Sequence, residues 1–539
     1  MSKVSNGRRH CLMAGIALLG LPMLTCAQGG PSQKQLNEAA ASKENWLHPN
    51  HDYAGLRFVD TKQITAANVA ALRPACMYQS KERVPAQSSP LVYDGTLYFT
   101  TTHYTVAIDA TSCRLRWEHA WQPRAKEVFP PNRGAAIQDG KIVRGTADGY
   151  LLALNAKSGA LIWSQPAADS KSGQFLSMPP LIYQDLVVIG TAGSEWAAKG
   201  WVGAFRLSDG AAVWKFSTIP EAGEAGSETW GKDPEIAAHG GGSVWTPFSF
   251  DLERAEVYVP VGNPAPDFYD EARPGANLYT SSLVVLDARS GKMKWYYQTV
   301  PHDIHDWDLP QVSPVFTTTV AGKKRRVVAA SGKDGLLKLI DRDTHEQLYS
   351  VPFVTRENVD VPLGDAIRVC PGPLGGAEWS SPAYDPMSNT LFEPANDWCA
   401  VIQKDKTPPH FDADMYLGGL PHMDPWEKAR GRLTAFDAST GKERWRYDAA
   451  KPMLAGVTAT SAGLLFTGES SGDVIALDAS SGKVLYRFNA GGPVAGGVIT
   501  YEIRGKQYVA AVSGFMSKFF ELNGGDQGGT PTVTVFSLP

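Results

Sequence analysis

The sequence predicts an all-β protein, an eight-bladed β-propeller with tryptophan-docking repeats. One pattern recurs seven times: a short apolar run, a position usually held by Asp, a turn rich in Ser, Thr and Gly, and an aromatic residue eight positions after the Asp. Successive copies lie about 40–50 residues apart, with longer intervals where insertions intervene. Self-similarity at that period indicates a propeller with about four strands in each blade. The copies occupy residues 107–117, 153–163, 204–214, 285–295, 339–349, 435–445 and 476–486.

Each copy predicts one hairpin of a blade. Its turn residues can join two antiparallel strands, and its aromatic side chain can then dock between neighbouring sheets. Seven copies leave one blade without the pattern, so we place the eighth either around residues 375–395 or at a sheet that joins the two termini. Because a closed ring of blades is one cooperative unit, residues 28–539 are expected to form a single domain.

Residues 1–27 have the features of a signal peptide. Three cations precede an apolar run at residues 11–24, and a small-residue cleavage site follows at Ala27. Twin-arginine export and lipidation of Cys26 match the pattern less well, so cleavage of a secretory signal is favoured. No other apolar run is long enough to span a membrane. The sequence therefore predicts an exported, periplasmic chain with no membrane span after residue 27.

Charge and cysteine content exclude several function classes. Removing residues 1–27 takes away three of 51 Lys and Arg residues and none of 55 Asp and Glu residues, so the formal net charge changes from −4 to −7. No basic excess remains to bind nucleic acid. Four cysteines remain, and the local pairs Cys76–Cys113 and Cys370–Cys399 are favoured, although spacing does not determine connectivity. None lies in a CxxC or CxxCH pattern, which argues against a zinc ribbon and a covalent c-type haem.

The segment PHDIHDWDLP, residues 301–310, holds three acids and two histidines in ten positions. Such a density of charge fits a metal site, an acid/base centre or a solvated loop. No Cys or third His accompanies His302 and His305 in a metal-ligand pattern, so zinc is disfavoured. Support of the loop is the expected role of His302 and Asp303.

Four segments resemble the sites of a known family. They are IGTAGSEWAAKGW at 189–201, GGSVWTPFSFD at 241–251, VPVGNPAPDFYD at 259–270 and QTVPHDIHDWDLP at 298–310. Together with the repeats they resemble the pyrroloquinoline quinone (PQQ) dehydrogenases, the quinoprotein alcohol and glucose dehydrogenases, over essentially the whole chain after residue 27. The fold of that family is an eight-bladed propeller. The resemblance implies PQQ as the cofactor, with Ca²⁺ bound beside it.

The resemblance also implies three metal ligands and a catalytic base. Glu195 matches the metal-binding glutamate of the family, and Asn263 matches the asparagine whose side-chain oxygen binds the metal. Asp306 matches the catalytic aspartate, which is also a ligand. Oxygen ligands from separate blades suit a hard cation such as Ca²⁺. The metal would polarise the quinone carbonyl while Asp306 removes the alcohol proton and hydride passes to the quinone carbon.

Contacts to PQQ follow from the same resemblance. Trp245 matches the tryptophan that forms the floor under the cofactor ring, and Arg133, in PPNRGAA, matches an arginine that binds this anionic cofactor. Lys333, in SGKDGLL, matches a basic residue beside the quinone oxygens. The other expected contacts are Gly193, Ser194, Ser243, Ser177, where the family often has Thr, and Gln87, where a glutamate usually contacts PQQ.

Departures from the family pattern concern the cover of the cofactor. The quinoprotein alcohol dehydrogenases place two adjacent cysteines shortly before the NRG arginine, but this chain has Glu127 and Val128 there. Ala192 replaces a common serine, and a tryptophan is missing around residues 453–454. The face that covers PQQ is therefore expected to differ from that of the methanol dehydrogenases.

Other residues bear on the substrate and the metal. Lys333 in place of Arg and the ending DWDLP resemble the glucose-dehydrogenase branch, which favours a sugar, a polyol or a bulkier secondary alcohol. His305 stands where Trp is usual and is expected to shape the substrate pocket. Asp308, counted as a further metal ligand, matches the extra aspartate that marks lanthanide use in methanol-dehydrogenase-like enzymes, but the glucose branch also has an acid there. Ca²⁺ is the expected metal and a lanthanide the alternative.

The leading hypothesis is a periplasmic dehydrogenase that oxidises an alcohol, polyol or sugar hydroxyl to a carbonyl. Electrons would leave to a separate cytochrome c or similar acceptor, since the chain has no haem motif. One alternative is a non-catalytic propeller resembling the scaffold of outer-membrane assembly, which has no need of Glu195, Asn263 and Asp306. The other is a PQQ-binding sensor, suggested by the missing cysteine pair and by Gln87.

Overall fold

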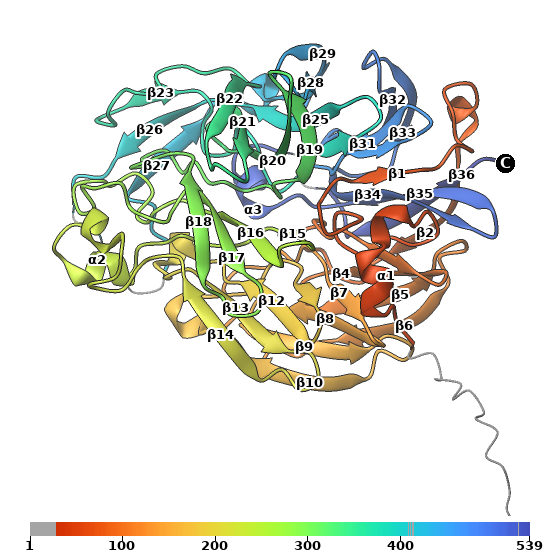
Figure 1. The fold of residues 1–539 in the computed structure, drawn as a ribbon, viewed down its shortest axis with the longest axis horizontal. Coiled ribbons are helices and arrows are strands. Elements are labelled where there is room, and N and C mark those ends of the chain that lie inside the picture. The colour runs from red at the N-terminus through yellow and green to blue at the C-terminus, as the bar shows by residue number, and fades with distance from the viewer. Residues whose placement is uncertain (1–28, 408, 410, 412–413, 526–527) are drawn as a thin grey trace, which may run out of the picture.

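Eight antiparallel sheets follow one another around a ring in the computed structural model (Figure 1). The model describes residues 29–539 except 408, 410, 412–413 and 526–527, so the expected signal peptide lies outside the described residues. Seven of the eight sheets have four strands, and a fifth strand extends the remaining one. The predicted all-β, eight-bladed propeller is confirmed.

The blades are numbered 1 to 8 from the N-terminal side, and the strands of each blade are named in order from first to fourth. Blades 1 and 2 are β3 (Leu91–Tyr93), β4 (Thr96–Thr100), β5 (Tyr104–Asp109), β6 (Leu115–Ala120), and β7 (Ala136–Gln138), β8 (Lys141–Gly145), β9 (Tyr150–Asn155), β10 (Leu161–Pro166). Blades 3 and 4 are β11 (Leu181–Tyr183), β12 (Leu186–Gly190), β13 (Trp201–Arg206), β14 (Ala212–Ser217), and β15 (Ser249–Asp251), β16 (Glu256–Val261), β17 (Ser282–Asp287), β18 (Met293–Gln298). Blades 5 and 6 are β19 (Val315–Val320), β20 (Lys323–Ser331), β21 (Leu336–Asp341), β22 (Gln347–Pro352), and β24 (Ala383–Asp385), β25 (Thr390–Asp397), β28 (Arg430–Asp437), β29 (Glu443–Ala449). Blades 7 and 8 are β30 (Thr458–Thr460), β31 (Leu464–Gly468), β32 (Asp473–Asp478), β33 (Val484–Asn489), and β34 (Val494–Ile503), β35 (Lys506–Ser513), β36 (Thr532–Ser537), β2 (Arg73–Gln79).

The remaining elements are short. β1 (Phe58–Val59) pairs in parallel with β30 of blade 7, and β23 (Ile367–Val369), β26 (Ala400–Lys404) and β27 (Gly419–Met423) form an additional three-stranded sheet. The helices are α1 (Gln33–Asn37), α2 (Pro234–Ala238) and α3 (Lys518–Leu522), with 3₁₀ turns η1 (Ala39–Ala41), η2 (Val69–Ala71), η3 (Ser170–Ser172), η4 (Ser194–Trp196), η5 (Ser227–Trp230) and η6 (Trp426–Lys428). Within the described part of the chain, none of these helices has the length and apolar character needed to cross a membrane.

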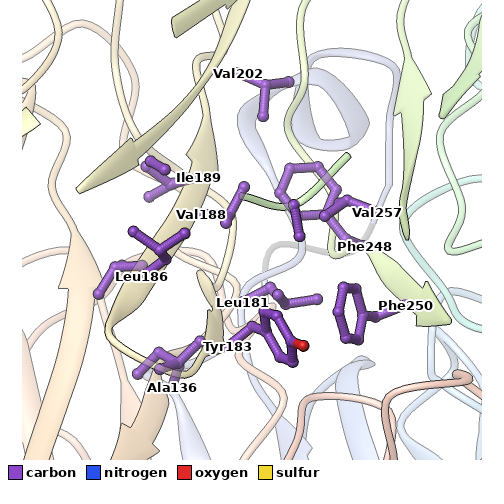
Figure 2. Packing of buried hydrophobic residues seen from close by; sticks show 14 of the residues in the cluster. Ala136, Leu181, Tyr183, Leu186, Val188, Ile189, Val202, Phe248, Phe250 and Val257 are labelled. Atoms are coloured by element: carbon purple, nitrogen blue, oxygen red, sulfur yellow. The ribbon is translucent and has the colours of Figure 1, made fainter. Parts of the chain in front are cut away.

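Each sheet packs between two neighbouring sheets. The strands nearer the axis of the ring are therefore buried on both faces and are apolar on both. Every residue of β4 is buried, whereas the fourth strand of the same blade, β6, buries only Trp117. Figure 2 shows one such contact, in which Tyr183 of β11 in blade 3 lies beside Phe250 of β15 in blade 4, with 4.6 Å between the ring centroids.

The aromatic residue of a repeat docks on the turn of the next blade. Trp117 Nε1 donates a hydrogen bond to the carbonyl of Ala156 in blade 2 at 2.9 Å. The turn residue under the indole is Gly159, which has φ +71° and whose added Cβ would lie 2.5 Å from the Trp117 ring. Backbone conformation and close approach therefore both require glycine. Equivalent hydrogen bonds join later blades through Trp163, Trp214, Tyr349 and Trp445.

The eighth blade is formed by joining the two ends of the chain. β2 pairs with β36, so one N-terminal strand completes a sheet of three C-terminal strands. The other expectation, an eighth blade around residues 375–395, is wrong. That stretch supplies β24 and β25, which begin the blade that carries the repeat at 435–445. The repeat copy lies on the third and fourth strands, so the first two strands of that blade have to come from the sequence before it.

A disulfide bond closes the ring where an aromatic residue would otherwise dock. In the strand register of blade 8, Cys76 lies opposite Val535 and next to a register shift. Trp117 lies opposite Ala107 and next to the same kind of shift in blade 1. Cys76 therefore occupies the docking position of blade 8. Cys113 occupies the turn position of blade 1 that Gly159 holds in blade 2, and the two sulfurs are bonded.

The second disulfide, Cys370–Cys399, connects the end of β23 to the start of β26 in the additional sheet. Both predicted pairings are confirmed.

Antiparallel alternation places two sets of loops at one end of the ring. Loops that join consecutive blades and loops between the second and third strands emerge there, whereas the repeat turns between the third and fourth strands emerge at the other end. The residues predicted for the site lie on the first two sets of loops. The repeat pattern therefore marks the scaffold, and the chemistry lies at the opposite end.

Candidate active site

These two sets of loops line a cavity, whose volume is about 960 Å³ when the space at its open entrance is included. Ten of the twelve residues predicted for the site line it: Gln87, Arg133, Ser177, Gly193, Glu195, Ser243, Trp245, Asp306, Asp308 and Lys333. The other two are buried against lining residues. Ser194 Oγ lies 2.7 Å from Ser243 Oγ, and the Asn263 backbone N–H donates to Asp308 Oδ1 at 2.9 Å.

Lys333 bridges two acids of the PHDIHDWDLP loop. Its Nζ lies 3.1 and 3.2 Å from the two carboxylate oxygens of Asp306 and 2.7 Å from Asp308 Oδ2. The Lys333 backbone N–H also donates to the Asp308 carbonyl at 3.0 Å, which fixes the two loops together. The Asp306 side chain is 14% exposed and that of Asp308 only 2%, so Asp306 is the acid that a bound molecule can reach.

The ionisation of this group depends on burial and on its charged neighbours. Burial raises the pKa of Asp306 well above its ordinary value, and the charge of Lys333 opposes that effect. Burial acts to lower the pKa of Lys333, but Asp306 and Asp308 outweigh it and hold the pKa well above its usual range. The lysine is therefore cationic at neutral pH and favours an ionised Asp306.

Arg133 lies between two indole rings. Its guanidinium carbon is 4.5 Å from the centroid of Trp245 and 5.6 Å from that of Trp379. One terminal nitrogen, Nη1, donates to Ser177 Oγ at 3.0 Å and to the Trp245 carbonyl at 3.3 Å. Burial lowers the pKa of Arg133 to about 9, which still leaves it cationic at neutral pH. A fixed cation thus lies beside the ring that the sequence assigns as the cofactor platform.

Acidic and amide oxygens gather at the inner wall. Asn263 Nδ2 donates to Asp267 Oδ1 at 2.8 Å, while Asn263 Oδ1 and Asp267 Oδ2 are buried without a partner in the described structure. Burial raises the pKa of Glu195, with a further contribution from Asp308. Burial likewise raises the pKa of Asp267 well above its ordinary value, assisted by Glu195 and Asp308. This mutual influence indicates an excess of negative charge that a cation would relieve.

The chain matches a known protein family over more than half of its length. The profile of the family described as PQQ, glucose/ethanol/alcohol dehydrogenase, β-propeller domain, matches residues 46–368, more than half of the chain. The protein belongs to the PQQ-dependent dehydrogenases. A second profile, for outer membrane protein assembly factor BamB, matches only residues 429–524. The PQQ-dependent alcohol dehydrogenases are oxidoreductases that act on CH–OH groups.

Individual members of the family agree with this placement. Quinohemoprotein alcohol dehydrogenase ADH-IIG of Pseudomonas putida is 30% identical over 531 residues, which cover 89% of this chain and 74% of that protein. The solved structure of ADHIIG from Pseudomonas putida HK5 has a TM-score of 0.88 and covers 95% of this chain and 83% of that one.

Two methanol dehydrogenases are similar as well. Methanol dehydrogenase [cytochrome c] subunit 1 of Methylorubrum extorquens is 28% identical and covers 93% of this chain and 89% of that protein. The solved structure of a europium-containing methanol dehydrogenase has a TM-score of 0.87 at 25% identity and covers 94% of this chain and 100% of that one.

The inner wall fits the metal ion of a PQQ-dependent dehydrogenase in its chemistry. Its donors are all oxygens, and two of them, on Asn263 and Asp267, lack a partner within the described residues. Such a set suits a hard cation. No three His, Cys, Asp or Glu side chains of the described chain are gathered as a ready metal site. The amide oxygen of Asn263 is a further donor of a different type, and Lys333 pairs with both Asp306 and Asp308.

The cavity also fits an anionic, planar cofactor. Arg133 Nε and Gln87 Oε1 are buried and have no hydrogen-bond partner in the part of the chain that the structure describes. Gln87 Nε2 is already held by the Met516 carbonyl at 2.9 Å, which fixes the amide orientation. Free donor and acceptor atoms beside an indole face are what PQQ would engage.

Three lining or supporting residues of this PQQ-dependent dehydrogenase were not predicted from the sequence. Trp379 and Glu378 line the cavity from the segment considered for the eighth blade. Burial raises the pKa of Glu378 to about 7, and Lys333 opposes the effect. Asp267 lies four residues after Asn263 in a segment that the family resemblance did single out, and a carboxylate there was the available signal.

The positions that hold adjacent cysteines in quinoprotein alcohol dehydrogenases carry an ion-pair tether in this chain. Glu127 Oε1 lies 2.7 Å from His103 Nε2, and His103 Nδ1 lies 2.6 Å from Glu82 Oε2. Two residues further along, Phe129 lines the cavity. The segment that leads to Phe129 therefore has a noncovalent anchor where that family has the cysteine pair.

The histidines of the PHDIHDWDLP loop lie away from the cavity. Asp303 accepts hydrogen bonds from the backbone N–H groups of His305, at 2.9 Å, and Trp307, at 2.7 Å, which agrees with its expected role in supporting the loop. His305 stacks on Trp307 at 4.1 Å and lines a separate outer hollow. The expectation that His305 shapes the substrate pocket is therefore wrong, because its ring packs outward on its neighbour.

Proposed function

We propose that this protein uses PQQ and a metal ion to oxidise an alcohol, polyol or sugar hydroxyl to a carbonyl, with Asp306 as the base. The supporting observation is the Asp306–Lys333–Asp308 group in a cavity that also contains Trp245 and Arg133. A non-catalytic propeller has no use for buried charges gathered at one cavity. Perturbed, buried ionisable groups in a cleft are typical of active sites.

Residues of this chain would hold the two bound groups as follows. Trp245, Arg133, Gln87 and Ser177 would bind PQQ, and the backbone around Gly193 and Ser194 with Ser243 would close the same wall. The metal ion would take oxygens from Glu195, Asn263, Asp306 and Asp308. When bound, PQQ accepts hydride and the metal ion supplies Lewis acidity.

The protein side chains then carry the proton chemistry. Asp306 takes the hydroxyl proton of the alcohol at a carboxylate oxygen, as a general base. Lys333 donates to both oxygens of that carboxylate and keeps it oriented between two loops. Arg133 and Lys333 compensate the negative charge that an anionic cofactor brings into a buried site.

Calcium is the proposed metal, with a lanthanide as the alternative. Asp308 supports the alternative, because an additional carboxylate suits a more highly charged ion, and a structural relative is a europium-containing methanol dehydrogenase. Electrons would pass to a separate cytochrome c or similar acceptor. This is supported by the absence of a CxxCH motif from the sequence and by the relative named methanol dehydrogenase [cytochrome c] subunit 1.

We also propose a periplasmic location. Two disulfides are formed between cysteine pairs, and disulfides persist in oxidising compartments. The pattern of residues 1–27 is that of a secretory signal. Fractionation of cells that express the full chain tests this, since a cytoplasmic protein with reduced cysteines would contradict it.

Reconstitution tests the enzymatic proposal. The purified protein is loaded with PQQ and either Ca²⁺ or La³⁺, PQQ absorbance is measured after removal of free cofactor, and dye reduction is followed with alcohols and sugars. Turnover with one of the metals is expected. PQQ retention without turnover under either metal would favour a sensor, and no PQQ retention would favour a scaffold; both results contradict the proposal.

Replacement of the base gives a sharper test. Asp306→Asn should retain PQQ but lower kcat by about 10²–10⁴-fold, the usual contribution of a general base. The matched control is Asp360→Asn, which makes the same change at an exposed loop position. An Asp306→Asn protein with normal kcat would remove Asp306 as the base.

A further inference from the structure

The outer part of the cavity is bounded by four aromatic side chains, which we call the aromatic clamp. Phe129 lies 5.2 Å from Trp196, 5.2 Å from Phe519 and 6.1 Å from Phe175, measured between ring centroids. Phe175 and Trp196 meet edge to face at 5.7 Å. All four residues line the cavity, and they come from four separate loops.

The cavity lining contains further apolar residues. They include Phe268, Leu374, Leu417, Pro421 and Met423. Residues next in sequence to this wall are large, apolar and exposed: Leu420 is 59% exposed and Leu522 is 66% exposed. Exposed apolar side chains that adjoin an apolar cavity are typical of a site that binds apolar molecules.

Polar side chains of the outer wall are already engaged. Ser517 Oγ accepts the N–H of Phe520 at the start of α3, and Asn523 Nδ2 donates to the Phe519 carbonyl at 2.9 Å. A sugar or polyol would place several hydroxyl groups against this wall, which offers them fewer hydrogen-bond partners than water does. Of the charged lining side chains, Arg133, Asp308, Lys333 and Glu378 are buried, whereas the clamp residues Phe129, Trp196 and Phe519 are only half-buried, which places these charges deeper in the cavity.

The clamp residue Phe129 is held in place on both sides. The preceding residue, Val128, donates its N–H to the Ala147 carbonyl at 3.1 Å, and the following one, Pro130, accepts from Thr102 Oγ1 at 2.6 Å. The backbone that carries the ring is therefore held at the cavity wall, which favours selection of substrates by shape.

We infer that the aromatic clamp binds the side group of an aryl-substituted primary alcohol and that Phe129 is its specificity-determining residue. The inference rests on the proposed alcohol oxidation at Asp306 and names its substrate class. The alcohol carbon then faces the inner charged group, and the aryl ring lies among the four aromatic rings in offset or edge-to-face contact. Sugars and polyols are poor substrates of this site.

The experiment compares kcat/KM of the PQQ- and metal-loaded protein for ethanol, 2-phenylethanol, glycerol and glucose. We expect 2-phenylethanol to exceed ethanol by at least tenfold, since even one methylene in an apolar pocket changes selectivity by about 10–200-fold. Phe129→Ala should lower kcat/KM for 2-phenylethanol by at least about tenfold and leave ethanol within about threefold. The control Tyr296→Ala removes a partly exposed aromatic ring on β18, outside the cavity, and should change neither.

A binding measurement separates the two proposals. Calorimetric titration of 2-phenylethanol into the loaded Asp306→Asn protein should give a Kd about tenfold lower than for the Phe129→Ala/Asp306→Asn protein, without any turnover. Oxidation of glucose or ethanol as efficiently as 2-phenylethanol, or an equal loss for all substrates in Phe129→Ala, overturns the inference and leaves the proposed oxidation intact. No oxidation of any alcohol overturns both.

Discussion

Lys333 shows how one residue can serve two loops at the charged end of the cavity. It contacts Asp306 and Asp308 with its ammonium group and the Asp308 carbonyl with its backbone N–H. Removal of one partner from a buried charge group leaves the others uncompensated, which is more costly than loss of an exposed ion pair. Lys333 is therefore expected to contribute to the stability of the fold as well as to the proposed chemistry.

Glu378 illustrates the opposite case, a buried carboxyl that destabilises the ligand-free protein. Its folded-state pKa, about 7, lies above the ordinary value of 4.5 because of burial. For an acid with a raised pKa, folding stability falls as pH rises from the unfolded pKa to the folded one. Glu378→Gln should therefore raise the free energy of unfolding at pH 8 by up to about 3 kcal/mol and have little effect at pH 4.

Urea unfolding of the two proteins at pH 4 and pH 8 measures this effect. Glu443→Gln is the matched control, because Glu443 is an exposed glutamate on β29. A stability difference that does not change with pH would mean that Glu378 does not titrate between these values. At the residue scale, Glu378 could not be predicted from its own sequence context, because nothing there distinguishes a buried glutamate from a solvated one.

The sequence pattern reports most directly on the third and fourth strands of the blades. The aromatic position and the turn four residues after the Asp position contact each other across blades, so both leave a mark that recurs. The additional sheet of β23, β26 and β27 has no such contact, and it was not predicted. Blade 8 was ambiguous because Cys76 takes the aromatic position there.

The tether of His103 makes one element sensitive to pH. A hydrogen bond to Glu82 raises the pKa of His103, burial opposes this, and Glu127 adds to the increase. A histidine with a raised folded pKa stabilises the fold fully below its unfolded pKa of about 6.5, and this contribution is lost as pH rises through the folded value. The segment that carries Phe129 should therefore loosen at alkaline pH.

Steady-state kinetics tests the tether. In the loaded protein, KM for 2-phenylethanol should rise by about two- to fivefold as the pH increases through the raised His103 pKa. The His103→Gln protein should show a KM that is high throughout and depends little on pH. His119→Gln, a change at a histidine on β6 outside the cavity, is the control and should retain the dependence. Identical pH profiles for His103→Gln and the parent protein would contradict a role for the tether.

On the scale of the whole molecule, the ring is closed by noncovalent docking at most blade interfaces and by a covalent bond at the junction of the termini. The seven repeat copies marked seven of the eight blades, but their spacing carries no information about which ends of the chain meet. Ten of the twelve residues that the family resemblance assigned to the site line one cavity, because loops from different blades converge at one end of a propeller. It could not place Trp379 or the three phenylalanines of the aromatic clamp, which lie outside the matched segments, and it gave no role to Trp196, which lies inside one of them.

The closure predicts a difference between the two disulfides. Cys76–Cys113 and Cys370–Cys399 span 37 and 29 residues, so loop entropy alone assigns each about 3–4 kcal/mol of stabilisation. Cys76–Cys113 also takes the place of the docking contact between blades 8 and 1, and its removal leaves that interface with the Tyr501 hydroxyl on the Ala110 carbonyl and the Tyr78–Phe99 ring contact. We therefore expect the Cys76→Ala/Cys113→Ala protein to lose more unfolding free energy than the Cys370→Ala/Cys399→Ala protein, by about 1–2 kcal/mol, and to be cleaved by protease near β2 before any other blade. Urea unfolding and limited proteolysis of the two double variants measure these differences, and the parent protein is expected to unfold in a single transition. Equal losses of unfolding free energy, or first cleavage within the additional sheet in both variants, would show that the junction of the termini is no weaker than the other blade interfaces.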